Sequence, residues 1–163
     1  MAQLSELEAK LKRAAQFINE RGTRIIEVEG INFMQENFEN EGFTDGGVQK
    51  WKPRKTTDKQ GRDLTRYRTN RRGRAGSLTK FGQKNQGRAL LTGHDTGGNK
   101  LRHSFKTRRD KSKVVFYTHK KYAKRHNEGL DGMPKRQFIG NSKTLEKNIE
   151  KQLTFHLDKI FKQ

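Results

Sequence analysis

The segment 52–88 constrains the fold most, because it lacks the apolar pattern that a buried helix or strand needs. It carries thirteen Lys or Arg residues against two Asp, a net charge of +11. Its few apolar side chains follow neither the helical nor the strand period: Leu64, Tyr67, Ala75, Leu78 and Phe81. We therefore predict an arm without a buried face between two folded blocks, 1–51 and 89–163. Self-repulsion should keep this arm extended and mobile until an anionic partner or a neighbouring subunit orders it.

The rest of the composition suits a single domain. Without the arm about 125 of the 163 residues remain, enough to bury about two-thirds of the unfolded surface. The net charge of +19 implies anionic partners or a surface that faces nucleic acid, but it says nothing about the fold. The absence of cysteine excludes disulfides, thiolate metal sites and a thiol nucleophile. Because no run approaches a signal core or the ~20 apolar residues of a membrane span, we expect a soluble protein that is not exported.

Two helices are predicted before the arm. A capping-box pattern at Ser5 and Glu8 marks the start of the first, and Gly22 its expected end. Its expected buried stripe is Leu7, Leu11, Ala14 and Ile18. The second is expected to start at Thr23 and to end before Gly42, where turn-forming residues follow. Its stripe is Ile25, Val28, Ile31, Met34 and Phe38. The pattern leaves open whether these are separate helices or one kinked rod.

Short elements are predicted after the arm. Strand propensity favours two pairing strands at 101–107 and 113–118, joined by a polar hairpin loop. A short helix at 122–129 should end at its glycine, and 136–140 suits a strand that returns to the sheet. Trp51, just before the arm, is expected to anchor the root of the arm to the core, with base stacking as the alternative role.

A long amphipathic helix is predicted at the end of the chain, capped by Asn141 or Ser142. Its expected buried stripe is Leu145, Ile149, Leu153, Leu157 and Ile160. The whole chain, 1–163, is thus predicted to be a single α+β domain. Its parts are two N-terminal helices, the inserted basic arm, a small antiparallel sheet and the C-terminal helix.

No pattern in the chain predicts catalysis. The histidines stand alone, in none of the common metal-binding spacings: His94, His103, His119, His126 and His156. The glycine-rich stretch 93–100 lacks the residue order of a phosphate-binding loop. The carboxylates are concentrated in the predicted helices at charge-pair spacing with Lys or Arg, and nothing predicts that they converge. We expect no catalytic, metal or cofactor site.

The arm has two possible roles. Its arginines could follow a phosphate backbone while Tyr67 stacks on a base, or they could pair carboxylates on a neighbouring subunit. We favour the neighbouring subunit, because Tyr67 and Phe81 alone are a thin stacking platform. The candidate contact residues are Arg66, Arg68, Arg71, Arg72, Arg74, Lys80 and Lys84.

A series of short motifs follows in a fairly specific order. It runs from Trp51-Lys52-Pro53 through Leu90-Leu91, Thr96-Gly97 and Leu101-Arg102-His103-Ser104, and ends in Met-Pro-x-Arg-x-Phe-x-Gly at 133–140. Its key residues are Trp51, Pro53, Leu91, Gly97, Leu101, Tyr122, Ala123, His126, Gly129, Pro134, Arg136, Phe138 and Gly140. In this the chain resembles the tailed-phage virion morphogenesis family, also called tail completion or neck proteins. The likeness is good over 89–163, but the arm is longer and more basic than the family pattern. Three residues, where the family usually has one, separate Gly97 from Leu101.

The resemblance implies a structural, non-enzymatic virion protein at the end of the tail or at the head–tail junction. It implies a ring of identical subunits, with a hexamer as the expected size, made in the host cytoplasm. The implied partners are neck or connector proteins and tail-tube proteins, with DNA in the lumen and no membrane. The alternative hypothesis is a nucleic-acid-binding protein whose arm contacts phosphates. A DNA-processing enzyme is a third, and no residue pattern favours it.

Overall fold

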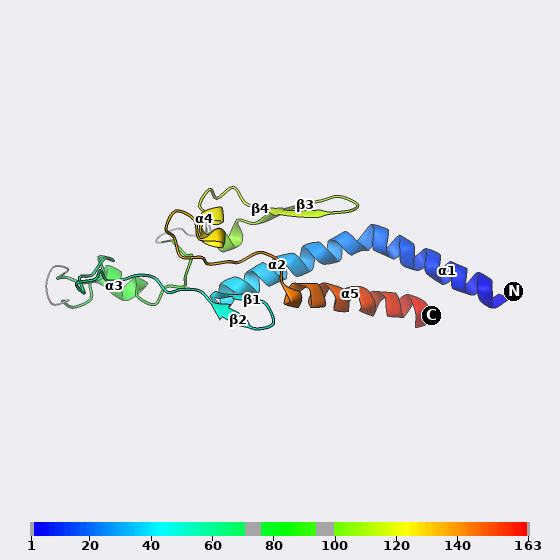
Figure 1. Cartoon of the computed structure of the whole chain (residues 1–163), viewed down its shortest axis with the longest axis horizontal. Helices are drawn as coiled ribbons and strands as arrows, with labels where there is room; N and C mark the ends of the chain where they lie inside the picture. The colour runs from blue at the N-terminus through cyan, green and yellow to red at the C-terminus, as the bar shows by residue number, and fades with distance from the viewer. Residues whose placement is uncertain (1, 71–75, 94–99, 163) are drawn as a thin grey trace.

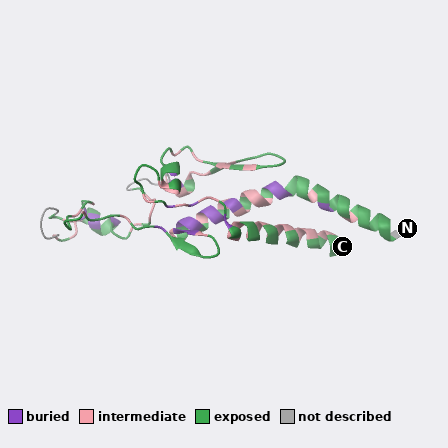
Figure 2. Ribbon diagram, viewed as in Figure 1, coloured by how far each residue is buried: buried purple, intermediate pink, exposed green. Residues whose placement is uncertain are grey.

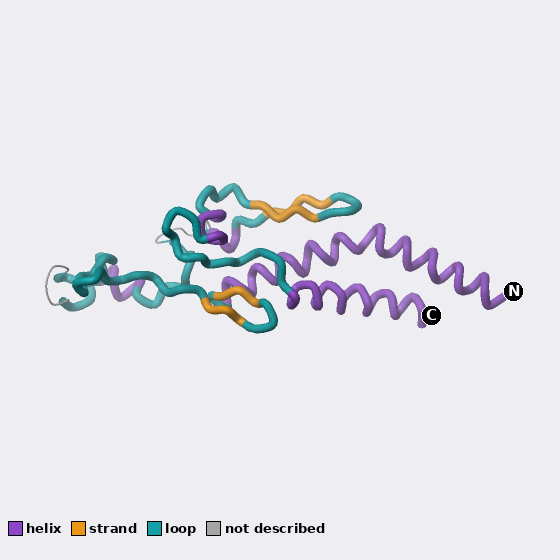
Figure 3. The backbone as a smooth tube through the Cα atoms, in the orientation of Figure 1, coloured by secondary structure: helices purple, strands orange, loops and turns teal. Residues whose placement is uncertain are grey.

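The structure, a computed structural model, describes residues 2–70, 76–93 and 100–162, and it is an elongated α+β molecule (Figure 1). A helical rod and an antiparallel C-terminal helix form one end, and the arm forms the other. Two β-hairpins and a short helix lie between these ends, joined by long irregular segments (Figure 3). The predicted α+β class is therefore confirmed, although the strands form two separate two-stranded sheets instead of one.

The N-terminal block is one bent rod. Helix α1 (Ala2–Phe17) continues through a π-helical turn (Ile18–Gly22) into α2 (Thr23–Glu39). The predicted stop at Gly22 is wrong, because its backbone keeps right-handed helical angles, φ −56° and ψ −48°. The helix continues through this one wide turn instead of ending, and the rod bends there (Figure 1). Helices commonly bend at π-helical turns.

The expected buried stripe of α1 is wrong for most of its members. Leu7 and Leu11 are 49% and 53% exposed, and Ile18 is 49% exposed, whereas Ala14 is buried. Helix α5 (Lys143–Lys162) packs on a neighbouring face of the rod, where the Phe17 and His156 rings lie 5.2 Å apart. The apolar stripe of α1 therefore faces outward in the single chain.

A short hairpin links the rod to the arm. Strands β1 (Gly42–Thr44) and β2 (Val48–Lys50) pair antiparallel around the predicted turn, in which Gly46 has a φ of +71°. Trp51 follows β2 directly and is 6% exposed, and its indole Nε1 donates to the carbonyl of Gln137 at 2.7 Å. The predicted anchoring role of Trp51 is confirmed.

The predicted second hairpin is also present. Strands β3 (Lys106–Arg109) and β4 (Val114–Tyr117) pair antiparallel. The first predicted strand, 101–107, is shorter than expected, because its first residues form a 3₁₀ turn, Leu101–His103. Helix α4 (Ala123–Glu128) ends as predicted at Gly129, which has a left-handed φ of 74°.

The predicted returning strand at 136–140 is wrong. The amides of Phe138 and Ile139 donate to the side-chain Oδ1 of Asn127, at 3.0 and 3.1 Å, and the amide of Arg136 donates to the carbonyl of His126. One side chain and one helical carbonyl thus satisfy the backbone that a strand neighbour would have paired.

Helix α5 begins where the capping pattern predicts. The Oγ of Ser142 accepts from the amides of Thr144 and Leu145, at 3.1 and 3.2 Å, and donates to the carbonyl of Thr44. Its predicted stripe faces the rod, but every member is only half-buried (Figure 2), and α5 contains no buried residue among those described. The described residues cover α5 on its rod side only, so its apolar face stays partly open beside the rod.

The main core lies where the two blocks meet. Phe38, Trp51, Leu101, Ala123 and Phe138 form its buried cluster. The Phe38 ring stacks on Phe138 with centroids 5.3 Å apart and meets the Trp51 ring edge-on at 5.5 Å. Both blocks are therefore needed to complete one hydrophobic centre.

The arm extends away from this core, but it has a local fold of its own. Isolated bridges join Thr57 to Asp63 and Arg68 to Leu78, and Thr79 caps the short helix α3 (Lys80–Asn85). Tyr67 is only 8% exposed, and its ring lies 5.8 Å from that of Phe81. The expectation that the arm has no buried face is therefore wrong for Tyr67, because turns that have no sequence period bring its contacts together.

Candidate anion-binding site at the root of the arm

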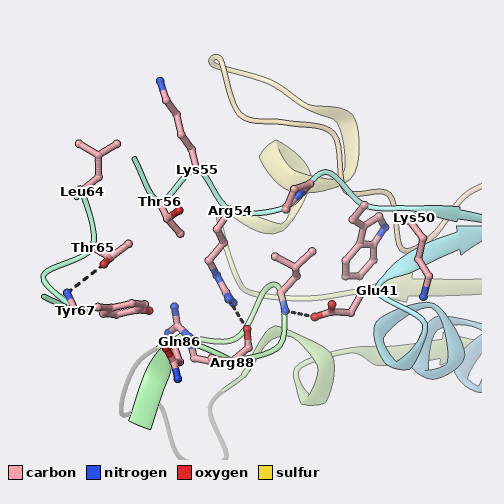
Figure 4. A pocket seen from close by; sticks show the side chains of 13 residues that line it. Glu41, Lys50, Arg54, Lys55, Thr56, Leu64, Thr65, Tyr67, Gln86 and Arg88 are labelled. Carbon is pink, nitrogen blue, oxygen red and sulfur yellow. Dashed lines mark hydrogen bonds between the residues drawn. The ribbon is translucent and has the colours of Figure 1, made fainter. Parts of the chain in front are cut away.

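A pocket of about 610 Å³ lies where the arm leaves the core and returns to it (Figure 4). The outgoing segment contributes Arg54 and Lys55, the returning segment contributes Arg88, and the end of the rod and β2 contribute Glu41 and Lys50. Figure 4 shows Arg54, Tyr67, Gln86 and Arg88 close together, with Glu41 and Lys50 on the other side. Chain positions more than thirty residues apart therefore build one site.

Arg54 clamps the two segments of the arm together. Its Nη1 donates to the carbonyl of Arg88, and its Nη2 donates to the carbonyl of Ala89. Glu41 adds a second tie, because its carboxylate accepts from the amide of Leu90. These contacts hold the returning segment against both the outgoing segment and the core.

Arg136 holds the outgoing segment from the other side. Its side chain is buried, and its Nε and Nη2 donate to the carbonyls of Lys52 and Pro53, at 3.0 and 3.2 Å. It also lines a neighbouring cavity of about 600 Å³, which shares Pro53, Arg54 and Lys55 with the first pocket. The segment 53–55 therefore forms a common wall between two cavities.

Positive charge dominates this region. Burial lowers the pKa of Arg54, and the nearby Arg88 lowers it further, while Tyr67 and Glu41 act in the opposite direction. Burial likewise lowers the pKa of Arg136, with Glu41 opposing. Guanidinium groups remain protonated in proteins. Arg54, Arg88 and Arg136 therefore all carry a positive charge near the single carboxylate of Glu41.

Arg88 differs from the other two arginines. Its Nε and Nη1 atoms are buried, and neither has a hydrogen-bond partner among the described residues. The guanidinium groups of Arg54 and Arg136 donate to backbone carbonyls, whereas Nε and Nη1 of Arg88 donate to no described residue. A buried charged donor without a partner is unfavourable, which makes Arg88 the feature of this site that a bound anion would satisfy.

The predicted contact residues of the arm lie elsewhere. Lys80 and Lys84 are exposed on α3, Arg66 is exposed, and the Nη1 of Arg68 donates to the carbonyl of Gly76 at 2.9 Å. Arg71, Arg72 and Arg74 lie outside the described residues. Sequence reasoning missed Arg54 and Arg88 as a pair. Their only signal was their position near the two ends of the basic segment.

Several residues of the short motifs described above hold the two blocks together. Trp51, Leu101, Ala123 and Phe138 belong to the core cluster, and Arg136 holds the backbone at Pro53. The remaining described members are half-buried or exposed around this core: Leu91, Tyr122, His126, Gly129, Pro134 and Gly140. Gly97 lies outside the described residues. The motif therefore specifies how the two blocks join.

Comparison with protein-family models, curated proteins and solved structures finds no match for this chain. Within residues 2–70, 76–93 and 100–162, no three His, Asp or Glu side chains gather in a way that could hold a metal ion. No helix in the described part of the chain is long and apolar enough to cross a membrane. The chemistry that the pocket offers is the binding of an anion by guanidinium and ammonium groups.

Proposed function

We propose that this protein is a structural virion protein of a tailed phage, a ring-forming tail completion or tail terminator protein at the head–tail junction. The observation that carries the proposal is the uncovered apolar surface of the helical end. Leu4, Leu7 and Leu11 are 67%, 49% and 53% exposed on α1, and Phe155 is 53% exposed on α5. Leu4, Leu7 and Leu11 follow helical spacing along one face of α1, and an exposed apolar stripe of this kind is typical of a surface that another molecule covers.

The shape of the subunit supports the same proposal. The arm and the helical pair project from a small core in opposite directions (Figure 1). A subunit that offers two different surfaces at opposite ends makes heterologous contacts, and such contacts generate rings when the rotation between subunits closes. Four of the residues that carry the resemblance to tail completion proteins lie in the core cluster: Trp51, Leu101, Ala123 and Phe138. The resemblance therefore involves residues that determine the fold, which supports the proposal.

The proposed ring is a hexamer that contacts neck or connector proteins on one side and tail-tube proteins on the other. DNA would pass through its lumen, where the surplus positive charge of the chain has a physical use. Native mass spectrometry and negative-stain electron microscopy of the concentrated protein, with and without a tail-tube partner, test this proposal. We expect closed rings of one size. Monomers alone under all of these conditions would overturn it.

A nucleic-acid-binding protein is the second candidate, favoured by the unpaired cations of the arm. Among the described arm residues the one ion pair joins Arg62 to Asp58 at 2.5 Å, so Arg66, Lys80 and Lys84 are exposed without a carboxylate. Replacing these three by Gln should reduce the salt dependence of DNA binding by about 2–3 in the log–log slope. An unchanged slope would exclude these cations as phosphate contacts.

A further inference from the structure

The geometry points to a phosphate-binding site in the pocket at the root of the arm, with the guanidinium of Arg88 as its principal contact. This inference is independent of ring formation, because every residue of the site belongs to one chain. It also differs from non-specific binding along the arm, because it assigns recognition to an enclosed pair of N–H groups and not to exposed lysines.

The first step of the argument is the state of Arg88. Its side chain lines the pocket, and its Nε and Nη1 have no partner among the described residues. In a guanidinium, Nη2 forms one edge with Nε and the other edge with Nη1, and the two parallel N–H groups along either edge have the spacing of two phosphate oxygens. Nε and Nη1 are closed to solvent in the free chain, so the Arg88 side chain would turn toward the pocket for a phosphate to supply the acceptors that the described chain does not provide.

The second step is the charge of the pocket wall. Lys50, Arg54, Lys55 and Arg88 line it against the single carboxylate of Glu41, a surplus of three positive charges. Glu41 already accepts from the amide of Leu90, and Arg54 is held by two carbonyls, so these two groups are fixed in place. A wall that is positive before binding favours an anion, and Arg88 is the part of it that moves to make the contact.

The third step distinguishes phosphate from a protein carboxylate. The pocket of about 610 Å³ is far larger than one carboxylate side chain needs, and the cavity beyond 53–55 adds Lys52 and Arg136. Two cation-lined cavities that share one wall fit an anion with charges repeated along its length. A nucleic-acid strand has this pattern, because each nucleotide carries one phosphate. We therefore expect phosphate of a nucleic-acid strand as the main ligand, with free phosphate as the other source of the same group.

The test uses the full chain and three variants. Arg88→Gln removes the charge and the fork, and Arg88→Lys keeps the charge and removes the fork. Lys111→Gln is the matched control, because it removes one exposed charge from the loop between β3 and β4, outside both the arm and the pocket. Fluorescence anisotropy measures binding of a short labelled single strand and of a duplex, and isothermal titration measures binding of inorganic phosphate. Circular dichroism and thermal melting confirm that each variant is folded.

We expect Arg88→Gln to weaken strand binding about tenfold or more and Lys111→Gln about twofold or less, since only the first variant loses a bidentate contact. Arg88→Lys should retain less than half of the wild-type affinity, and it keeps the test valid if the glutamine variant does not fold. Loss of inorganic phosphate binding alone would support the site with free phosphate as its source. Equal effects of Arg88→Gln and Lys111→Gln on every phosphate ligand would overturn the proposal. So would an acidic peptide that binds through Arg88 while no phosphate ligand does.

Discussion

Phe138 shows how much of the stability depends on single contacts between the two blocks. Its side chain is 2% exposed and lies 5.3 Å from the rings of both Phe38 and Phe105. Phe138→Ala should lower the free energy of unfolding by about 3–5 kcal/mol, because it leaves a cavity in the only described cluster that joins the blocks. Urea denaturation measures this loss. Phe155→Ala, which truncates a ring that is 53% exposed, is the control and should cost less than about 1 kcal/mol. Equal losses would mean that the core lies elsewhere.

His126 gives the protein a predicted sensitivity to acid. Burial lowers its pKa from the ordinary 6.5, and the neighbouring Arg136 and Arg125 lower it further. The unfolded chain therefore binds the proton more readily than the folded chain. Stability should be unaffected by His126 above about pH 6.5 and should fall as the pH drops below that value.

Melting temperatures of the wild type and His126→Gln, measured between pH 7.5 and pH 5, test this dependence. The range extends about one pH unit or more to either side of the ordinary histidine pKa, so that it covers the titration. The variant should lose less stability on acidification than the wild type. His119→Gln, at an exposed histidine, is the control and should keep the wild-type slope. If His126→Gln and the wild type lose the same stability on acidification, His126 does not contribute to the acid sensitivity.

Single residues also show where sequence reasoning succeeds. Trp51 was predictable as an anchor, because an indole in a polar stretch is costly to leave in water. Arg88 was not predictable, because its missing partners depend on how residues 54 and 88 meet in space. A basic segment contains many arginines, and no local pattern distinguishes the one that the fold isolates.

At the scale of elements, α3 depends on one close approach to the turn that contains Tyr67. A Cβ at Gly82 would lie 2.1 Å from the backbone oxygen of Tyr67, so Gly82→Ala should push α3 away and expose the Tyr67 ring. Gly87→Ala is the control, because a Cβ there meets no atom within 4 Å. Hydrogen exchange should show faster exchange within 65–85 in Gly82→Ala alone, with the core protected as before. Unchanged protection of α3 in this variant would contradict the packing.

The elements that sequence reasoning predicted well are those whose signals are local. The pairing of β3 with β4, the glycine end of α4 and the Ser142 cap of α5 follow from strand propensity, glycine and capping chemistry. The segment 136–140 was wrongly predicted as a strand, because Asn127 supplies its hydrogen bonds from a distant helix. The arm was predicted to lack a buried face, which is wrong for Tyr67, because the bridges beside it form between turns that have no periodic pattern.

At the scale of the whole molecule, charge is divided unevenly along the chain. Residues 1–51 carry a net charge of −3, whereas 52–88 and 89–163 each carry +11. The acidic block is the rod and the first hairpin, and the arm projects from the opposite end of the molecule (Figure 1). Composition alone could predict anionic partners, but not that α5 and the β3–β4 hairpin of the basic C-terminal block would pack along the acidic rod.

The apolar stripe of α1 gives the sharpest test of assembly. Leu7 and Leu11 are exposed in the single chain, so the double variant Leu7→Gln/Leu11→Gln should leave the melting temperature of the monomer nearly unchanged. In a ring that covers this stripe, the same change buries two amides in an apolar contact and should weaken association about tenfold or more. Analytical ultracentrifugation over a range of concentrations measures both states.

Leu130→Gln is the matched control for this experiment, because Leu130 is 40% exposed near α4, away from the helical end. It should leave association unchanged. If the double variant assembles as well as the control, α1 is not a subunit contact. If instead the double variant lowers the stability of the monomer by several degrees, the stripe packs within its own chain, and its predicted burial belongs to the fold and not to the assembly.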